Sequence, residues 1–217
     1  MKQAIFVSGI DTDAGKTYAT AFLARRFMDS GYSVATQKFI QTGCVGESED
    51  IVAHRRLCGV GMLPEDLDGT TAPIIFSYPA SAQLAARIDG REIDLTLVDK
   101  ATEKLLENYD IVLIEGAGGL MVPVDDETFT IDYVASRKLP MMLVSNARLG
   151  SINHTVLSLE AVKARGIDLK AVVFNHHFDS DTLIAEDTLG FLKRYLNRHF
   201  PMTELIEIVT IQRTRRN

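Results

Sequence analysis

The sequence contains few cysteines and no long hydrophobic run. Only two cysteines, Cys44 and Cys58, occur in 217 residues, and their spacing fits neither a zinc site nor a disulfide framework. The apolar run near the N-terminus soon meets Asp11 and Asp13, whereas a membrane span needs roughly 20 apolar residues and a secretory signal needs a longer apolar stretch with a cleavage site. We therefore expect a cytoplasmic protein with reduced thiols and no membrane partner.

Basic charge is also scarce. The chain carries 23 lysines and arginines against 29 acidic residues, which gives a formal net charge of −6. Non-specific binding of nucleic acid needs a basic surface, so this balance argues against a nucleic-acid partner. No Pro/Ser-rich linker, internal repeat or low-complexity segment divides the sequence. We therefore expect one domain over residues 1–217.

The sequence does contain short apolar runs that alternate with longer segments of helical period. The runs are apolar almost throughout, as strands buried on both faces of a parallel sheet are. We expect strands at residues 4–7, 33–36, 111–114, 141–144, 171–174 and 205–209, and helices at 17–30, 95–108, 131–138, 152–165 and 182–199. This order predicts an α/β fold with a mostly parallel central sheet and helices on both faces. Residues 59–81, with three prolines, are expected to form surface loops.

The clearest motif, at residues 9–17, reads Gly-Ile-Asp-Thr-Asp-Ala-Gly-Lys-Thr and lies between the first predicted strand and the first predicted helix. Backbone N–H groups of such a loop bind phosphate oxygens, while Lys16 reaches the β- and γ-phosphates and the Thr17 hydroxyl ligates magnesium. The first glycine lies one residue further from Gly-Lys than in the usual pattern, which indicates a P-loop subclass. Asp11 and Asp13 favour a nearby cation or a cationic substrate.

Three further charged residues fall near predicted strand ends or helix starts. Glu115, followed by Gly-Ala-Gly-Gly, comes after a strand, where P-loop enzymes hold magnesium, although a solvated residue in a tight turn would look the same. Lys38 can neutralise a transferred phosphoryl group or be an ordinary surface lysine. Asp50 begins a possible helix, where the helix dipole alone favours an acidic residue. The five histidines have no spacing typical of a metal site.

From residue 3 to about residue 177, these motifs together resemble the dethiobiotin synthetase family, which acts in biotin synthesis. The family's phosphate loop differs from residues 9–17 at two positions, and its Lys-Pro-x-x-Ser/Thr-Gly segment matches residues 38–43 with Phe39 in place of the proline. Glu-Gly-Ala-Gly-Gly stands at residues 115–119 and Leu-Gly-x-Ile-Asn-His at residues 149–154. The family usually ends with a Gly-x-Ile-Pro segment, but its nearest counterpart here, residues 206–209, lacks both the glycine and the proline. The resemblance therefore implies no base preference.

The resemblance implies a P-loop NTPase fold and a homodimer that uses Mg²⁺ and ATP to close a ureido ring from 7,8-diaminononanoate and CO₂ or bicarbonate. It implies that Lys16 and Lys38 are catalytic, and that residues 148–154 of one subunit complete the site of the other. The implied ligands of Mg²⁺ are Thr17, Asp50 and Glu115. The implied nucleotide-binding residues are Thr12, Asp13, Ala14, Gly15, Lys16, Thr17, Glu115, Gly116, Ala117, Gly118 and Asn175, and the implied substrate-binding residues are Asp11, Thr12, Thr42 and Gly118.

Three alternatives remain open at this stage. The chief one is a deviant P-loop switch ATPase of the partitioning or division-site type, which usually carries a signature lysine early in the loop, where this chain has Ile10 and Asp11. An amidotransferase-type synthetase needs a glutaminase domain with a nucleophilic cysteine, for which we expect no room in this chain. A pure binding module would leave Lys38 and the strand-end carboxylates unexplained. The basic residues 213–216 are expected to be a solvated terminus.

Overall fold

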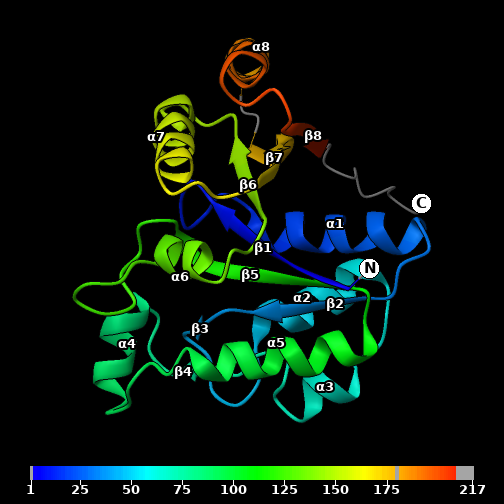
Figure 1. The fold of residues 1–217 in the computed structure, drawn as a ribbon, viewed down its shortest axis with the longest axis vertical. Helices are drawn as coiled ribbons and strands as arrows, with labels where there is room; N and C mark the ends of the chain where they lie inside the picture. The colour runs from blue at the N-terminus through cyan, green and yellow to red at the C-terminus, as the bar shows by residue number, and fades with distance from the viewer. Residues whose placement is uncertain (1, 179–180, 209–217) are drawn as a thin grey trace, which may run out of the picture.

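The centre of the fold is a parallel sheet (Figure 1). The computed structural model describes residues 2–178 and 181–208. The strands of the main sheet are β1 (Gln3–Gly9), β2 (Val34–Lys38), β5 (Ile111–Gly119), β6 (Met141–Asn146), β7 (Leu169–Asn175) and β8 (Glu204–Ile208), in the order β2-β5-β1-β6-β7-β8. Every neighbouring pair runs parallel, which confirms the predicted sheet. The carboxyl ends of the strands therefore share one edge, where open α/β sheets bind ligands.

Helices cover both faces of this sheet (Figure 1). On one face lies α1 (Lys16–Asp29), with α2 (Glu49–Cys58) packed beside it, and on the other lie α5 (Thr96–Asn108), α6 (Thr130–Ser136), α7 (Ser151–Ala164) and α8 (Thr182–His199). Successive strand residues point to opposite faces, so Phe6 packs on the α5 side and Val7 on the α1 side. Both faces are thus apolar, which explains the continuous apolar runs of the strands.

Smaller elements complete the fold, and some of them were not predicted. Strands β3 (Gln41–Thr42) and β4 (Ile75–Phe76) form a separate two-stranded sheet, and η1 (His176–Phe178) is a 3-10 turn. The expectation of loops alone at residues 59–81 was wrong, because α3 (Pro64–Leu67) and β4 lie there. Pro64 fits the first turn of α3 because the N–H that it lacks would have no partner inside the helix. Helix α4 (Ala82–Ile88) was absent from the prediction, since it is only seven residues long.

Two strands at the candidate site extend further than predicted. Strand β2 includes Lys38, and β5 continues through the glycine-rich segment to Gly119. Strand β5 pairs with β1 as far as Gly9 and Gly119, with a register shift between Val7 and Gly9. As a result, Lys38 and Glu115 lie inside paired strands rather than after them. The predicted strand at 205–209 is β8, while Val209 and residues 213–216 lie outside the described part of the chain.

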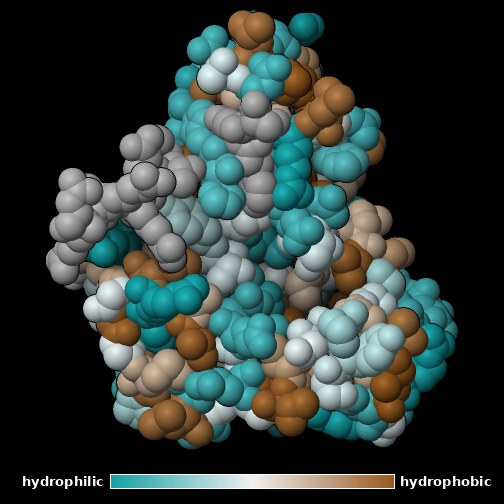
Figure 2. All heavy atoms as spheres, turned by 180° about the vertical axis from the view of Figure 1, so that it is seen from behind, coloured by the Kyte–Doolittle hydropathy of each residue, from teal (hydrophilic) through white to brown (hydrophobic). Residues whose placement is uncertain are grey.

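The surface carries scattered apolar side chains. On the face shown in Figure 2, hydrophobic residues occur in small groups among hydrophilic ones. Leu149, just before α7, is 90% exposed, and Leu157, within α7, is 62% exposed. Within residues 2–178 and 181–208, no helix combines the length and the apolar character needed to cross a bilayer.

Candidate functional site

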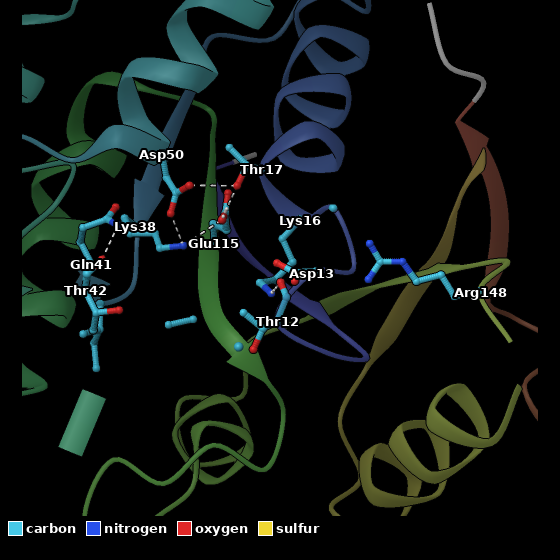
Figure 3. Close-up of a pocket in the computed structure, with 14 residues that line it drawn as sticks. Thr12, Asp13, Lys16, Thr17, Lys38, Gln41, Thr42, Asp50, Glu115 and Arg148 are labelled. Atoms are coloured by element: carbon cyan, nitrogen blue, oxygen red, sulfur yellow. Dashed lines mark hydrogen bonds and ion pairs between the residues drawn. The ribbon is translucent and has the colours of Figure 1, made fainter. Parts of the chain in front are cut away.

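A cavity of about 430 Å³ lies at the carboxyl ends of the central strands (Figure 3). Its walls come from the phosphate loop, the ends of β2 and β5, the start of α2, and the loop after β6. The lining residues are Thr12, Asp13, Gly15, Lys16, Thr17, Lys38, Ile40, Gln41, Thr42, Asp50, Glu115, Ala117, Gly118 and Arg148. The fold thus brings most of the site residues predicted from the sequence into one cavity.

The phosphate loop wraps around the side chain of Lys16. Gly15, which precedes α1, has a φ of 87°, a left-handed conformation that glycine adopts without steric cost. No side chain caps the N-terminus of α1, so its first N–H groups are suited to an anion. The Lys16 Nζ donates to the backbone oxygens of Asp11 at 3.0 Å and Thr12 at 2.9 Å. The loop therefore presents its donors and its lysine on the same side of the cavity.

The ammonium of Lys16 is easier to deprotonate than that of an ordinary lysine. Burial is the main cause, because it disfavours the charged form, and the nearby Lys38 adds to it. Three carboxylates, those of Glu115, Asp50 and Asp11, offset part of this effect. Together these influences lower the pKa of Lys16 to about 8. A triphosphate beside this lysine would favour the charged form again.

Four polar side chains form a compact cluster at the centre of the cavity (Figure 3). The Thr17 Oγ1 lies 3.0 Å from Asp50 Oδ1 and 3.1 Å from Glu115 Oε1. The Lys38 Nζ lies 2.6 Å from Asp50 Oδ2 and 2.8 Å from Glu115 Oε1. It also donates to the Gly116 carbonyl at 3.2 Å. One lysine and one hydroxyl therefore share the same two carboxylates.

The burial of this cluster decides between the alternatives that the sequence left open. Glu115 is 1% exposed and Lys38 is 4% exposed, so neither is a solvated surface residue. Burial alone would raise the pKa of Glu115, but Lys38 and His54 outweigh it and hold that pKa well below its usual range. For Lys38, burial opposes the charge, yet Glu115 and Asp50 prevail and raise its pKa. Both side chains are therefore held in their charged forms.

The carboxylate of Asp50 faces the cavity rather than the N-terminus of its own helix. Ser48 is the residue that caps α2, since its Oγ accepts a hydrogen bond from the Ile51 N–H at 3.3 Å. The carboxylate of Asp50 instead points to Thr17 and Lys38. Its place at the start of α2 thus serves the cavity as well as the helix.

The oxygen atoms of this cluster have the chemistry that Mg²⁺ prefers. The ion is usually held by one or two carboxylates together with phosphates and water, and here a hydroxyl and two carboxylates already converge on one point. Within the described residues, no group of three or more His, Cys, Asp or Glu side chains is arranged to hold a metal by itself. The donor set therefore fits a magnesium ion that arrives with phosphates.

Four of the predicted site residues, Asp11, Ala14, Gly116 and Asn175, are not among those that line the main cavity. Asp11 lines a neighbouring hollow of about 340 Å³, and Thr12 lines both. The Ala14 side chain is buried in the core, and Gly116 contributes its carbonyl to Lys38. Asn175 ends β7 outside the lining residues, and its Nδ2 is buried with no hydrogen-bond partner among the described residues.

Some residues that contact the site were not predicted from the sequence. His54 Nε2 lies 2.6 Å from Glu115 Oε2, although the two residues are 61 positions apart. Gln41 lines the cavity, and its Oε1 accepts a hydrogen bond from Ser48 Oγ at 2.6 Å. One signal was available for His54, because it follows Asp50 by four residues and so shares its face of α2.

Comparisons with known proteins agree on the family. A family model described as an AAA domain matches residues 3–208. The chain is 48% identical over 206 residues to the ATP-dependent dethiobiotin synthetase of Haemophilus ducreyi, which covers 95% of this chain and 98% of that protein. It is 43% identical over 213 residues to that of Pasteurella multocida, with 97% and 100% covered. For Chlorobaculum tepidum the identity is 48% over 207 residues, with 94% and 87% covered.

Solved structures resemble the fold. Chloroplast FtsY from Physcomitrella patens superimposes with a TM-score of 0.52 at 15% identity, covering 94% of this chain and 57% of that chain. At this identity the likeness concerns the fold alone, and it agrees with the P-loop NTPase fold expected from the sequence.

Proposed function

The chain belongs to the AAA-domain family and to the family of ATP-dependent dethiobiotin synthetases, and from this premise we propose that it closes the ureido ring of dethiobiotin from 7,8-diaminononanoate and CO₂. ATP drives the reaction, and ADP and phosphate are released. The observation that carries the proposal is the convergence of Lys16, Lys38 and two carboxylates in one cavity at the phosphate loop. We further propose that residues 1–217 act as one domain in the cytoplasm.

The phosphate end of the cavity is assigned first. Backbone groups of residues 12–17 and the Lys16 ammonium bind the β- and γ-phosphates. Residues 115–118, at the end of β5, contact the nucleotide. Thr17, Asp50 and Glu115 would hold Mg²⁺, and a bound ion would neutralise phosphate charge.

In this reaction the protein mainly positions the reacting groups and neutralises negative charge. One amine of the substrate reacts with CO₂ to give a carbamate, whose oxygen attacks the γ-phosphate. The second amine then attacks the carbonyl carbon of the resulting mixed anhydride and expels phosphate. Since the nucleophiles belong to the substrate, Lys38 and Lys16 act by holding the reacting groups and offsetting negative charge. The raised pKa of Lys38 keeps its ammonium charged for that task.

The diamine is assigned to the Thr42 and Gly118 side of the cavity and to the adjoining hollow. That hollow is lined by Asp11 and by apolar side chains, among them Met121 and Leu157. A carboxylate beside an apolar wall suits a cationic amine joined to an alkyl chain. Arg148 lines the main cavity and His154 lines the hollow, and the exposure of Leu149 beside them supports a homodimer in which residues 148–154 complete the partner's site.

The base of the nucleotide is assigned to Asn175. Its buried Nδ2 has no partner among the described residues, and an acceptor atom of a base, a ring nitrogen or a carbonyl oxygen, would satisfy that donor. We propose no base preference.

The test is an assay of ADP release and dethiobiotin formation by the purified protein with diaminononanoate, bicarbonate and MgATP, repeated with CTP and GTP. We expect ADP release to depend on the diamine and to match dethiobiotin formed. Hydrolysis that ignores the diamine and rises with DNA or lipid would favour the switch ATPase instead. Sedimentation of the protein tests the homodimer, and cell fractionation tests the location.

A further inference from the structure

His54 lies directly behind the candidate site. It is 0% exposed on α2, and its ring contacts two different elements. The Nε2 atom lies 2.6 Å from Glu115 Oε2, and the Nδ1 atom lies 3.0 Å from Thr36 Oγ1. The ring therefore joins a carboxylate of the site to a hydroxyl on strand β2.

On the side away from the site, Thr36 is contacted by Arg55, which is itself held by an ion pair. Arg55 Nη1 donates to Thr36 Oγ1 at 2.8 Å. Asp66 fixes the same guanidinium by two hydrogen bonds, from Nε and from Nη2, both of 2.8 Å. The side chains of Arg55 and Asp66 are 5% and 1% exposed. A buried, bidentate ion pair of this kind holds its geometry closely.

The direction of the hydrogen bonds follows from the donors available. A guanidinium only donates, so Thr36 Oγ1 accepts from Arg55, and its single hydroxyl hydrogen can go to His54 Nδ1. The Nδ1 atom then accepts from Thr36, and Nε2 carries the hydrogen that it donates to Glu115.

We infer that His54 is a positioning residue, which acts through Glu115 as the last donor of a directed chain Arg55–Thr36–His54. By holding Glu115 Oε2, the ring turns Oε1 toward Thr17 at 3.1 Å and Lys38 at 2.8 Å. The inference rests on the proposed function for the role of Glu115. It adds a buried set of residues that orients a magnesium ligand, in the way that hydrogen bonds behind metal ligands commonly do.

Paired substitutions separate positioning from simple packing. The amide of His54→Gln reaches the place of Nε2 and can still donate to Glu115, whereas that of His54→Asn reaches only the place of Nδ1. Thr36→Ser keeps the hydroxyl, and Thr36→Val removes it. Loss of such a hydrogen bond typically weakens metal affinity by roughly 10- to 100-fold. We therefore expect H54N and T36V to show this loss and T36S to stay close to the wild type. H54Q, which keeps the donor to Glu115 but not the acceptor for Thr36, should lie between H54N and the wild type.

The measurement is the Mg²⁺ concentration for half-maximal binding of a fluorescent ATP analogue to the full chain, with kcat and KM for MgATP recorded beside it. Thr102→Val is the matched control, because Thr102 Oγ1, on α5, donates at 2.7 Å to Gln37 Oε1, and Gln37 is the neighbour of Thr36 on β2. Thermal unfolding identifies any variant that fails to fold. If H54N does not fold, the T36V and T36S pair decides.

Two results would overturn the inference. One is that H54Q needs as much Mg²⁺ for half-maximal binding as H54N, and the other is that T36V needs no more Mg²⁺ than T102V. The proposed function fails separately. A wild-type protein that binds MgATP and makes no dethiobiotin would refute that function, while the Mg²⁺ titration would still test His54.

Discussion

Lys38, the last residue of β2, and Glu115, within β5, are register partners, and their side chains form a buried ion pair with a 2.8 Å distance between Nζ and Oε1. The two residues are 77 positions apart in the chain. A buried pair contributes little net stability, but removal of one partner leaves a buried charge uncompensated. Its position beside the phosphate loop suggests that the pair serves the reaction, with Asp50 and Thr17 as its neighbours.

Replacement of Lys38 should abolish most of the activity. We expect Lys38→Ala to lower kcat by at least roughly 100-fold, because a charge aimed at the transferring phosphoryl group is lost. ADP release with diaminononanoate and bicarbonate measures the effect. Lys104→Ala is the control, since this lysine is half exposed and pairs with Asp68 at the surface. An unchanged rate in K38A would remove Lys38 from the proposed mechanism.

Nucleotide binding should weaken as the pH rises through 8. In the free protein, burial first and Lys38 second lower the pKa of Lys16 to about 8, whereas bound phosphates should raise it. Binding near pH 8 would then take up a proton, and affinity would fall between pH 7 and pH 9. Calorimetry in buffers of different ionisation enthalpy measures the uptake. Lys16→Arg, which keeps its charge, should lose this pH dependence. Affinity that increased with pH would contradict the assignment.

Phe39 should be important for stability. Its ring packs against Phe6 and Tyr133, with centroid distances of 5.4 and 4.8 Å, and its N–H donates to the Glu115 carbonyl at 2.8 Å. We expect Phe39→Ala to lower the free energy of unfolding by roughly 3–5 kcal/mol. Denaturant unfolding measures it, with the 48% exposed Tyr78 changed to alanine as control. Equal losses in the two variants would argue against this packing role.

Gly118 should tolerate no side chain. Its φ is +66°, and an added Cβ would lie 2.6 Å from Val122 Cγ2. Gly118→Ala should therefore strain the wall of the cavity by about 1–3 kcal/mol and reduce turnover. Gly61→Ala is the matched control, because its backbone is not in the left-handed region and its Cβ would meet nothing within 4 Å. Wild-type stability and rate in G118A would show that the loop adapts.

Most of the architecture could be predicted from the sequence because its signals are local. Apolar runs and helical periods located the strands of the main sheet and its long helices, and α8 (Thr182–His199) matches its predicted bounds. The errors came where a local signal was misleading. Residues 116–119 have the composition of a turn, yet β5 continues through them, because its pairing with β1 extends to Gly119.

The sequence by itself determined the phosphate loop, the parallel sheet and the family, since each depends on residues that are neighbours in the chain or stand in a fixed order along it. Only the tertiary structure decided that Lys38 and Glu115 are a buried pair and that His54 stands behind them. It also left Asn175 outside the main cavity. These facts depend on strand order and register, which bring residues 61 and 77 positions apart into hydrogen-bonding distance. No local pattern encodes such contacts, because packing of the whole sheet is what selects them.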